Sequence, residues 1–490
     1  MSARRVVASS LAATALGCGG GDSGTAPEPG PALRVIARPQ ARDTVQATSL
    51  QALVVEFRTP EGRLDPGIVV RFEVAAPRDS TRSNERGVVV CRLDESPSCF
   101  APLYPGTSFA ADTTDARGRA KVVLRFGTVS GAAWTVITVP EYGIRDSVRF
   151  DVDPGSPARI QITNRDTLVV VGRQLTLLAA VVDRFGNARS DPLVYHWDAS
   201  RVSVDATGKV SATAPGRTQV LISAGAAQDT AFLSVVPTGR FMGVAIDGPN
   251  TGNVVAMDFD GANQRLIARN ATLPRVSVDG RVIVHVGIET STYRMHFVEG
   301  DGSLRRVTDP TTPLAGESYG QLAADGWVYF SGRYDNGNFA IWRVRPDGTS
   351  EERLTNGFAE WRSWPSPDGK KIVYSRYVSG WDIAVMDVAT RQTTSLRAVG
   401  LGAAWSPNGQ YVAFPQEHGG NIKVANADGT GGVQTVPNTE SEFGDTVDWT
   451  ADSQFLIARS GCCVELVRAV DGTRMPLKFS SWLVQPVRAP

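Results

Sequence analysis

The feature that most constrains the fold of this chain is a short turn motif that recurs throughout its second half. The motif is an Asp or Asn followed by Gly or Ser, and successive copies are 46, 43, 40 and 44 residues apart. The copies begin at Asp279, Asp325, Asp368, Asn408 and Asp452. Each copy lies between two apolar runs, so we expect a two-residue hairpin turn, for which Asp-Gly and Asn-Gly supply positive φ angles. A strand repeat of this period predicts a β-propeller, because a four-stranded blade buries its faces only against neighbouring blades.

The two ends of the repeat region predict how the ring closes. A second set of turns alternates with the first, and its six members begin at Asp260, Asp301, Asp347, Ala389, Asp428 and Asp471. The hairpin missing from the first set can be assembled from the C-terminal run 486–490 and from Thr238-Gly239 with the apolar residues that follow it. We therefore predict a six-bladed propeller over residues 238–490 that is closed by the C-terminal strand. This pairing covers two sheet edges that would otherwise be open.

The first half of the chain has a different organisation. Residues 32–237 consist of short β-branched runs bounded by Gly, Pro and Asp, which suit antiparallel strands, and no helical periodicity is present. The run Asp153-Pro154-Gly155-Ser156-Pro157 separates two series of such strands. We predict an all-β chain in which two β-sandwiches, at 32–154 and 155–237, precede the propeller.

The N-terminus reads as an export signal. Residues 1–17 contain Arg4-Arg5 and an apolar stretch that is too short to span a membrane, and residues 18–31 are a Gly- and Pro-rich tether. The run ending in Gly17-Cys18 resembles a bacterial lipoprotein signal, and this resemblance implies that Cys18 is acylated. The lipid would anchor the protein in the cell envelope, and we expect the outer membrane, on its periplasmic or surface face. Simple cleavage with secretion, or export by a twin-arginine route, are the alternatives.

The cysteines agree with export. If Cys18 carries lipid, four cysteines remain, an even number that suits an oxidising compartment. Cys91 and Cys99 flank a short polar segment, and we expect a disulfide between them. Cys462 and Cys463 are adjacent, and we interpret them as two thiols or a vicinal bridge rather than a redox site, since no Cys-x-x-Cys spacing is present.

Composition and spacing argue against several classes of ligand. The chain has 50 basic and 50 acidic residues, so we expect neither nucleic-acid binding nor binding to an anionic membrane surface by charge. The four histidines, at 196, 285, 296 and 418, lack metal-ligand spacing and are expected to be strand residues. Asp258, Asp260 and Asn263 resemble part of a calcium loop, but the distal Glu is missing and a tight hairpin is the preferred interpretation. We predict no metal and no cofactor.

Three segments carry resemblances to known families. Residues 113–139 resemble the late strands of bacterial Ig-like domains of the invasin and intimin kind, and residues 168–189 with 206–223 resemble a second bacterial Ig-like family. These resemblances imply two rigid modules, either an adhesin or, as we prefer, a stalk. The motifs WSPNG, WPSPDG and DIAVMD (382–387) resemble the β-propeller repeats of TolB, the periplasmic partner in the Tol–Pal envelope system. TolB has a small α/β domain where this chain has the two sandwiches.

Aromatic and basic residues near the expected inner strands are candidates for a binding surface. They are Arg275, Arg362, Trp364, Trp405, Trp449 and Arg488. The tryptophans could offer stacking surfaces at the mouth of the channel, or they could pack between blades. The arginines could bind an acidic peptide terminus, or they could be solvated or paired with Asp448 or Glu360.

These features predict a non-catalytic envelope lipoprotein in which an Ig-like stalk presents a propeller that binds a protein or glycan. An enzyme, either a lyase or a hydrolase with residues at the channel mouth, is one alternative, and a structural surface-layer protein is another. Related propellers accompany serine peptidases, but the chain has no G-x-S-x-G nucleophile turn. Paired carboxylates at a channel mouth would favour an enzyme, whereas an aromatic rim would favour binding. Neither the identity of the ligand nor an oligomeric state follows from the sequence.

Overall fold

The computed structural model describes residues 30–47, 51–75, 87–91, 109–246, 248–289, 292–416, 420–439, 443–460, 463–477 and 483–489. Within these residues the chain is built of strands, and its helical elements are the two 3-10 turns η2 (Pro140–Tyr142) and η3 (Gly248–Asn250). The predicted all-β class is therefore confirmed. The chain divides into two compact units, one of Met1–Ala158 with Val182–Arg189 and one of Arg159–Val181 with Ser190–Pro490.

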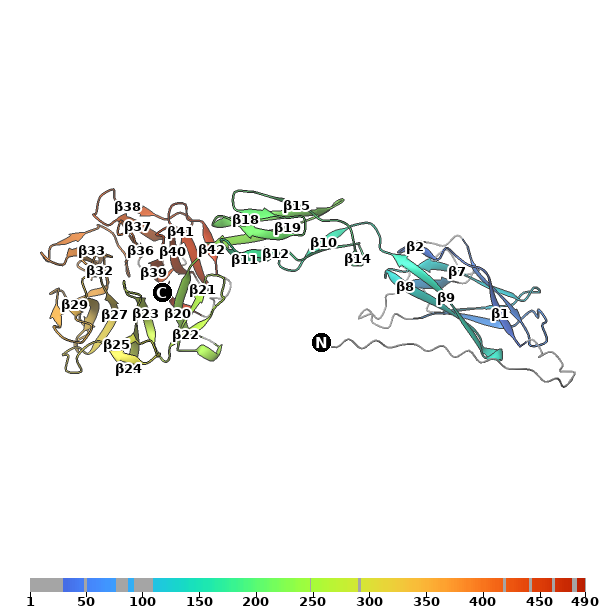
Figure 1. The fold of residues 1–490 in the computed structure, drawn as a ribbon, viewed down its shortest axis with the longest axis horizontal. Coiled ribbons are helices and arrows are strands. Elements are labelled where there is room, and N and C mark those ends of the chain that lie inside the picture. The colour runs from blue at the N-terminus through green and yellow to red at the C-terminus, as the bar shows by residue number, and fades with distance from the viewer. Residues whose placement is uncertain are drawn as a thin grey trace, which may run out of the picture. The chain divides into compact units, whose positions relative to one another are not determined.

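The first unit is a sandwich of two sheets, shown in blue to teal in Figure 1. The strand orders are β1-β3-β7-β5 and β2-β9-β8-β4-β6. The bounds are β1 (Ala32–Ala37), β2 (Arg42–Thr44), β3 (Leu53–Arg58), β4 (Val69–Val74), β5 (Val88–Cys91), β6 (Phe109–Thr113), β7 (Arg119–Phe126), β8 (Gly131–Val139) and β9 (Ile144–Asp153). Alternate residues of both sheets, among them Phe57, Phe72 and Phe150, meet in one buried core, as the period-2 pattern of the sequence requires.

The first unit also includes the hairpin Val182–Arg189, which sequence analysis placed in the second sandwich. The buried carboxylate of Asp183 accepts hydrogen bonds from the backbone N–H groups of Gly155, Phe185 and Asn187 at 2.8 to 2.9 Å. The Asn187 amide in turn donates to the carbonyl oxygen of Thr128 at 2.8 Å. These polar contacts hold the hairpin to the first unit, and a strand pattern alone does not reveal them.

The second unit begins with another pair of facing sheets, in the orders β11-β19-β18-β15 and β12-β17-β16. The strand bounds in this part of the chain are β10 (Arg159–Ile162), β11 (Asp166–Val170), β12 (Gln174–Thr176), β13 (Ala179–Val182), β14 (Ala188–Arg189), β15 (Val194–Trp197), β16 (Val202–Val204), β17 (Lys209–Ala212), β18 (Gly216–Ala224) and β19 (Ala227–Val236). Buried residues of both sheets, such as Val204, Val220 and Leu233, form its core.

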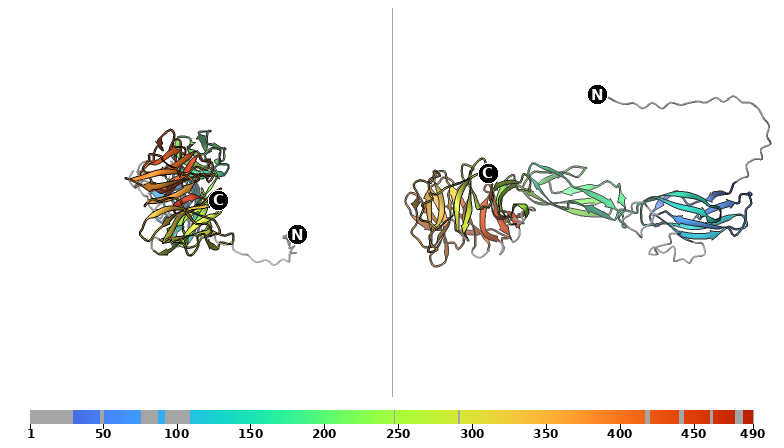
Figure 2. Two further views of the ribbon diagram at one scale, coloured as in Figure 1. Left: turned by 90° about the vertical axis from the view of Figure 1, so that its left-hand side faces the viewer. Right: turned by 90° about the horizontal axis from the view of Figure 1, so that it is seen from below.

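The rest of the second unit is a propeller of four-stranded antiparallel sheets, and the described residues contain six of them. Five are formed by consecutive strands, and Figure 2 shows them from two further sides. Their bounds are β23 (Thr272–Val276), β24 (Val282–Glu289), β25 (Thr292–Val298), β26 (Leu304–Arg306); β27 (Gly316–Leu322), β28 (Val328–Arg333), β29 (Phe339–Val344), β30 (Glu352–Arg353); β31 (Glu360–Pro365), β32 (Lys371–Tyr377), β33 (Trp381–Asp387), β34 (Thr393–Ser395); β35 (Ala404–Trp405), β36 (Tyr411–Pro415), β37 (Ile422–Asn426), β38 (Val433–Thr435); β39 (Phe443–Trp449), β40 (Phe455–Ser460), β41 (Cys463–Arg468) and β42 (Arg474–Pro476).

The remaining sheet joins the two ends of the propeller. It has the order β22-β21-β20-β43, with β20 (Arg240–Ala245), β21 (Val254–Asp258), β22 (Arg265–Ala268) and the C-terminal strand β43 (Leu483–Arg488). β43 pairs antiparallel with β20, and Met242 lies opposite Val487. The predicted closure by the C-terminal strand is confirmed, and β43 lies beside the inner strands β23 and β39.

The recurring turns differ from the expected two-residue hairpins. The backbone N–H of Ser277 bonds to the carbonyl oxygen of Arg281, which leaves three loop residues, and the matching bond from Ser366 to Lys371 leaves four. Only the residue after the Asp or Asn has a positive φ, as at Gly280 (84°). The acidic side chain instead accepts a backbone N–H two residues ahead, and this local bond stabilises the longer loop. The expectation of two-residue turns was wrong for this reason.

Because the strands are antiparallel, these loops all lie at one end of the propeller, which we call the turn end. The connections into each inner strand lie at the opposite end. The Asp258 and Asp260 hairpin is also at the turn end, and its carboxylates accept hydrogen bonds from the Arg173 guanidinium at 3.2 and 2.5 Å. Asn263 donates to Asp258 at 2.7 Å, so the structure places a tight hairpin with an arginine partner at this sequence.

Candidate binding site at one end of the propeller

Bulges in the inner strands shape the centre of the propeller. The strand register shifts between Thr272 and Arg275 in β23, and at the corresponding places in β27 and β31. The residues in these bulges include Leu273, Tyr319 and Arg362, whose φ angles are 45°, 57° and 58°. Positive φ is unusual for residues other than glycine and tends to occur where the surrounding structure fixes a functional geometry.

Hydrogen bonds from the preceding sheet hold these bulges in place. The backbone N–H of Gly320 donates to Nε2 of His285 at 3.3 Å, and that of Arg362 donates to Oγ of Ser331 at 2.9 Å. The next sheet repeats the contact, because Gly402 donates to Oγ of Ser375 at 3.2 Å. The three acceptors occupy the same position in successive second strands, so each sheet anchors the inner strand of the next.

His285 is the polar centre of one such contact. Its Nδ1 lies 3.0 Å from the carbonyl oxygen of Leu273, so Nδ1 must carry the proton if Nε2 is to accept from Gly320. Burial lowers the pKa of His285 to about 3, which keeps the ring neutral. Together with His196 and His296, which lie in β15 and β25, His285 is a strand residue, as predicted; His418 lies outside the described residues.

The structure brings three of the six candidate residues together around Tyr319. The guanidinium carbons of Arg275 and Arg362 each lie 5.4 Å from the centre of the Tyr319 ring. Arg275 also lies 4.7 Å from the ring of Trp364, and desolvation by burial lowers the pKa of its guanidinium. All three candidates are nearly inaccessible to solvent, so they lie beneath the accessible surface of the propeller.

Arg488 lies beside the buried carboxylate of Asp448, which accepts the backbone N–H groups of Arg488 at 2.9 Å and Trp449 at 2.7 Å. Burial raises the pKa of Asp448, while the charges of Arg488 and Arg275 oppose that shift. Asp448, which sequence patterns suggested as a partner of the candidate arginines, therefore does lie close to Arg488. Glu360 instead accepts the backbone N–H of Gly357 at 2.8 Å.

Trp405 and Trp449 lie in the packed interface between sheets. Trp449 is 1% exposed, and its Nε1 donates to the carbonyl oxygen of Ala404 in the preceding sheet at 3.2 Å. Trp364 and Trp405 are 5% and 4% exposed and belong to the same buried cluster. The three tryptophans therefore pack between blades, which was one of the two expectations for them, and do not offer exposed stacking surfaces.

A group of aromatic side chains that sequence analysis did not select lies at the end opposite the turns. The rings of Tyr319, Phe339 and Trp381 all lie 5.6 to 6.5 Å from that of Trp361, and Tyr377 continues the row at 5.6 Å from Trp381. We call these five residues the aromatic row and this end the aromatic end.

The aromatic end is also accessible. Tyr377 is 58% exposed, and Phe358, near the end of the connection from β30 into β31, is 80% exposed. The backbone N–H of Phe339 bonds to the carbonyl oxygen of Phe358 at 3.2 Å, so Phe358 is close to the partly exposed part of the aromatic row. Exposed large apolar side chains that gather in this way are a common mark of a recognition surface. The sequence signal was present in GFAEWRSWP and YVSGWD, but these residues lie outside the repeated turn motif on which the alignment of the repeats rests.

A pocket of about 380 Å³ opens beside the aromatic row. It is lined by Leu273, Tyr293, Gly316, Glu317, Ser318, Tyr319, Arg333, Phe339 and Trp361. The carboxylate of Glu317 is fully buried and accepts hydrogen bonds from the Met295 N–H at 3.0 Å and the Thr308 hydroxyl at 2.7 Å. Arg294 and Arg306 lie 3.6 and 3.7 Å from it. Glu317 is thus fully engaged in holding the sheets and is poorly placed to transfer protons.

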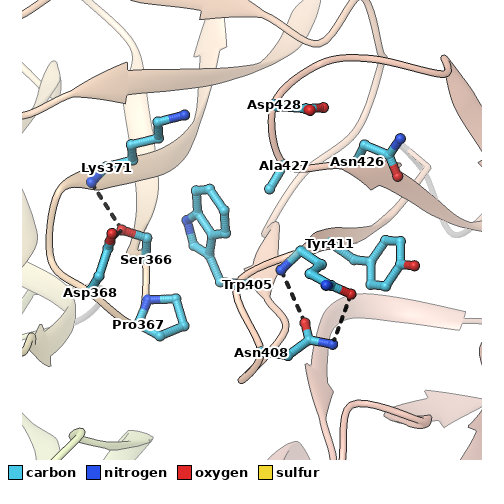
Figure 3. Close-up of a pocket in the computed structure, with 12 residues that line it drawn as sticks. Ser366, Pro367, Asp368, Lys371, Trp405, Asn408, Tyr411, Asn426, Ala427 and Asp428 are labelled. Carbon is cyan, nitrogen blue, oxygen red and sulfur yellow. Dashed lines mark hydrogen bonds between the residues drawn. The ribbon is translucent and has the colours of Figure 1, made fainter.

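A larger cavity, of about 580 Å³, lies at the turn end between two neighbouring sheets (Figure 3). The ring of Trp405 stands between Ser366, Asp368 and Lys371 on one side and Tyr411 and Asn426 on the other. The pKa of Asp368 is lowered chiefly by the hydrogen bond from the Ser366 hydroxyl. A carboxylate that already stabilises its own turn holds no proton near neutral pH, so this cavity offers no general acid at Asp368.

Several predicted features lie wholly or partly outside the described residues. These are the export signal, Cys18, most of the tether, Cys99 and Cys462. Cys91 is buried in β5 and is disulfide-bonded, and its pairing with Cys99 stays a prediction. Cys463 is partly buried in β41. No helix in the described part of the chain is long and apolar enough to cross a membrane, and the same residues contain no cluster of three or more potential metal ligands.

Comparisons with known proteins give only distant similarities. No protein-family model matches the chain. An uncharacterised protein of Agrobacterium fabrum, Atu1656, is 33% identical over 124 residues, which are 24% of this chain and 40% of that protein. The chain thus spans well under half the length of this curated relative.

Solved structures with similar folds include TolB and two proteins named as enzymes. TolB from Acinetobacter baumannii is 16% identical, with 61% of this chain and 83% of TolB covered and a TM-score of 0.44. A gluconolactonase from Xanthomonas campestris is 14% identical over 43% of this chain and 77% of its own, with a TM-score of 0.36. An oligogalacturonate lyase in complex with manganese is 12% identical over 63% of this chain and 97% of its own, with a TM-score of 0.34. Similarity at this level does not specify an activity.

Proposed function

We propose that this protein is a non-catalytic envelope lipoprotein in which two Ig-like sandwiches form a stalk for a six-bladed, TolB-like propeller. In this proposal Cys18 carries the lipid anchor, and the aromatic end of the propeller binds a protein or glycan partner. The observation that carries the proposal is the exposure of Phe358 and Tyr377 next to the partly exposed rings of Trp361 and Trp381. Large aromatic side chains lose little conformational entropy on binding and provide extensive contact area.

The carboxylates near this surface support binding rather than catalysis. Glu317 is balanced by two arginines, and Asp382 accepts hydrogen bonds from Arg376 at 2.9 Å and from the Ser395 hydroxyl at 2.6 Å. Both carboxylates therefore serve contacts within the propeller, whereas a general acid or base must reach the proton that it transfers to or from the substrate.

Capture from envelope extracts tests this function. The full chain is immobilised, and the bound material is analysed for both protein and carbohydrate. We expect the double substitution F358S/Y377S at the aromatic end to reduce capture at least tenfold, because it removes two exposed rings. The matched control is V470S, which changes a side chain that is 85% exposed in the loop between β41 and β42 at the turn end.

Equal capture by wild type, F358S/Y377S and V470S would show that the aromatic end is not the binding surface. Release of a chemically altered carbohydrate or peptide by the wild-type chain would contradict the non-catalytic part of the proposal.

A further inference from the structure

The pocket beside the aromatic row contains a positive charge that no described carboxylate balances. Arg333, at the end of β28, is partly exposed, and its Nη1 donates to the Thr292 hydroxyl at 3.3 Å. Among the described residues no Asp or Glu lies within ion-pair distance of Arg333, whereas Arg294 and Arg306 already balance Glu317. The Arg333 guanidinium is therefore available to pair with an anionic group of a ligand.

Two further residues of the pocket have polar groups that form no hydrogen bond with the described residues. The Ser318 hydroxyl and the Trp361 Nε1 are buried and have no partner within the described part of the chain. A buried donor without a partner costs roughly 1–3 kcal/mol, and a ligand that satisfies it recovers this free energy. Trp361 Nε1 can only donate and a hydroxyl readily does so, so the complementary ligand group is an acceptor.

The walls of the pocket are aromatic, and the aromatic row continues away from it. Tyr293, Tyr319, Phe339 and Trp361 line the pocket, and Trp381 and Tyr377 follow at 6.5 and 5.6 Å between successive ring centres. The electron-rich faces of such rings attract the C–H groups of a sugar ring. A row of rings with similar spacing suits a chain of linked units better than a single small ion.

We propose, on the basis of the binding function argued above, that the ligand is an acidic oligosaccharide that contains uronate. One uronate enters the pocket, where Arg333 binds its carboxylate and Ser318 and Trp361 provide further donors. The neighbouring sugar rings stack along Trp361, Trp381 and Tyr377.

The backbone around the pocket argues for a sugar over an extended peptide. A peptide that binds as a strand needs free backbone partners on the protein. The N–H groups of Gly320 and Arg362, which lie in the two bulges nearest the pocket, already bond to His285 and Ser331.

The test is calorimetric titration of the full chain with three probes: a trimer of galacturonic acid, the neutral trimer of galactose, and a short uncharged peptide with a free C-terminal carboxylate. We expect the uronate trimer to bind most tightly. R333Q should weaken its binding about tenfold or more, as expected for the loss of a charge-assisted hydrogen bond, and should change the binding of the neutral trimer little. The control is R265Q, which removes a similarly charged, exposed side chain from β22. Thermal melting confirms that each variant is folded.

Three outcomes would overturn this inference: equal binding of the acidic and neutral trimers, an effect of R333Q no larger than that of R265Q, or tighter binding of the peptide. Failure of all three probes would also overturn it. The proposed function would still stand in each case if capture from envelope extracts were lost in F358S/Y377S and kept in V470S, so the two proposals can fail separately.

Discussion

The two ends of the propeller are built from the same strands but by different rules. At the turn end, the same side-chain-to-backbone bond recurs from sheet to sheet, as from Lys370 to Asp368 and from Gln410 to Asn408. At the aromatic end, neighbouring sheets differ, and one of them supplies Trp361, Tyr377 and Trp381. The comparison shows that repetition is retained where the backbone needs a specific turn and is lost where the side chains are accessible. The end that departs from the repeat is therefore the one suited to recognition.

The largest expected effect on stability comes from removing β43, the strand that closes the ring. Deletion of residues 483–490 leaves β20 without its inner partner and opens the ring between β20 and β39. We expect a loss of several kcal/mol in the free energy of unfolding and rapid amide hydrogen exchange in β20. An unchanged melting temperature in thermal unfolding would contradict the role of β43 in closing the ring.

A second prediction concerns the anchoring of the aromatic end by His285. Its pKa of about 3 in the fold is below the ordinary value of 6.5, so the neutral form stabilises the fold. This contribution is complete above pH 6.5 and is lost as the pH falls towards 3, at about 1.4 kcal/mol per pH unit. We expect H285Q to be less stable than wild type at pH 7 and to lose less stability than wild type between pH 6.5 and 4. Denaturant unfolding at several pH values measures both.

The exposed His196 provides the control for that experiment. H196Q should keep the steep acid dependence of the wild type. If H285Q also kept it, the buried imidazole would not be its source.

A third prediction compares how strongly the backbone is constrained at the turn end and at the aromatic end. Gly369, at the turn end, has a φ of 72°, and a Cβ at this position would lie 3.0 Å from Asp325. Gly380, at the aromatic end, has no positive φ, and a Cβ added there would meet no other atom within 4 Å. We expect G369A to destabilise the fold by about 1–2 kcal/mol and G380A to change it by less than about 0.5 kcal/mol. Equal losses in chemical denaturation would remove the distinction between the two ends.

The smallest expected effect on stability is at exposed apolar side chains. F358S and V470S should each change the free energy of unfolding by less than about 0.5 kcal/mol, because both side chains lie largely in solvent. They should differ in ligand capture, which only F358S should reduce. A large loss of stability in F358S would mean that the ring supports the fold.

The structural elements that recur from blade to blade could be predicted from the sequence, whereas those that differ between blades could not. The turns and the pairing of Met242 with Val487 follow from local turn chemistry and from the need to cover sheet edges, and both can be read from residue types. The length of the turn loops was not predicted, because the hydrogen bond that Asp368 accepts from its own loop backbone favours a longer loop than Asp-Gly alone indicates.

The candidate site was predicted only in part. Arg275, Arg362 and Trp364 do lie close together around Tyr319, but burial places them beneath the accessible surface. Trp361 is next to Arg362 in sequence and lines the pocket at the point where the register of β31 shifts. A bulge depends on contacts from the preceding sheet, here Ser331, and such contacts leave no local signal.

The pairing of the last strand with the first also has a consequence for biosynthesis. Since β20 is the first strand of the propeller in the chain and β43 follows all the others, the ring can become complete only after β43 has been synthesised. A product that ends before β43 exposes the backbone edge of β20, which chaperones and proteases can engage. Ring closure thereby distinguishes molecules that contain β43 from those that lack it.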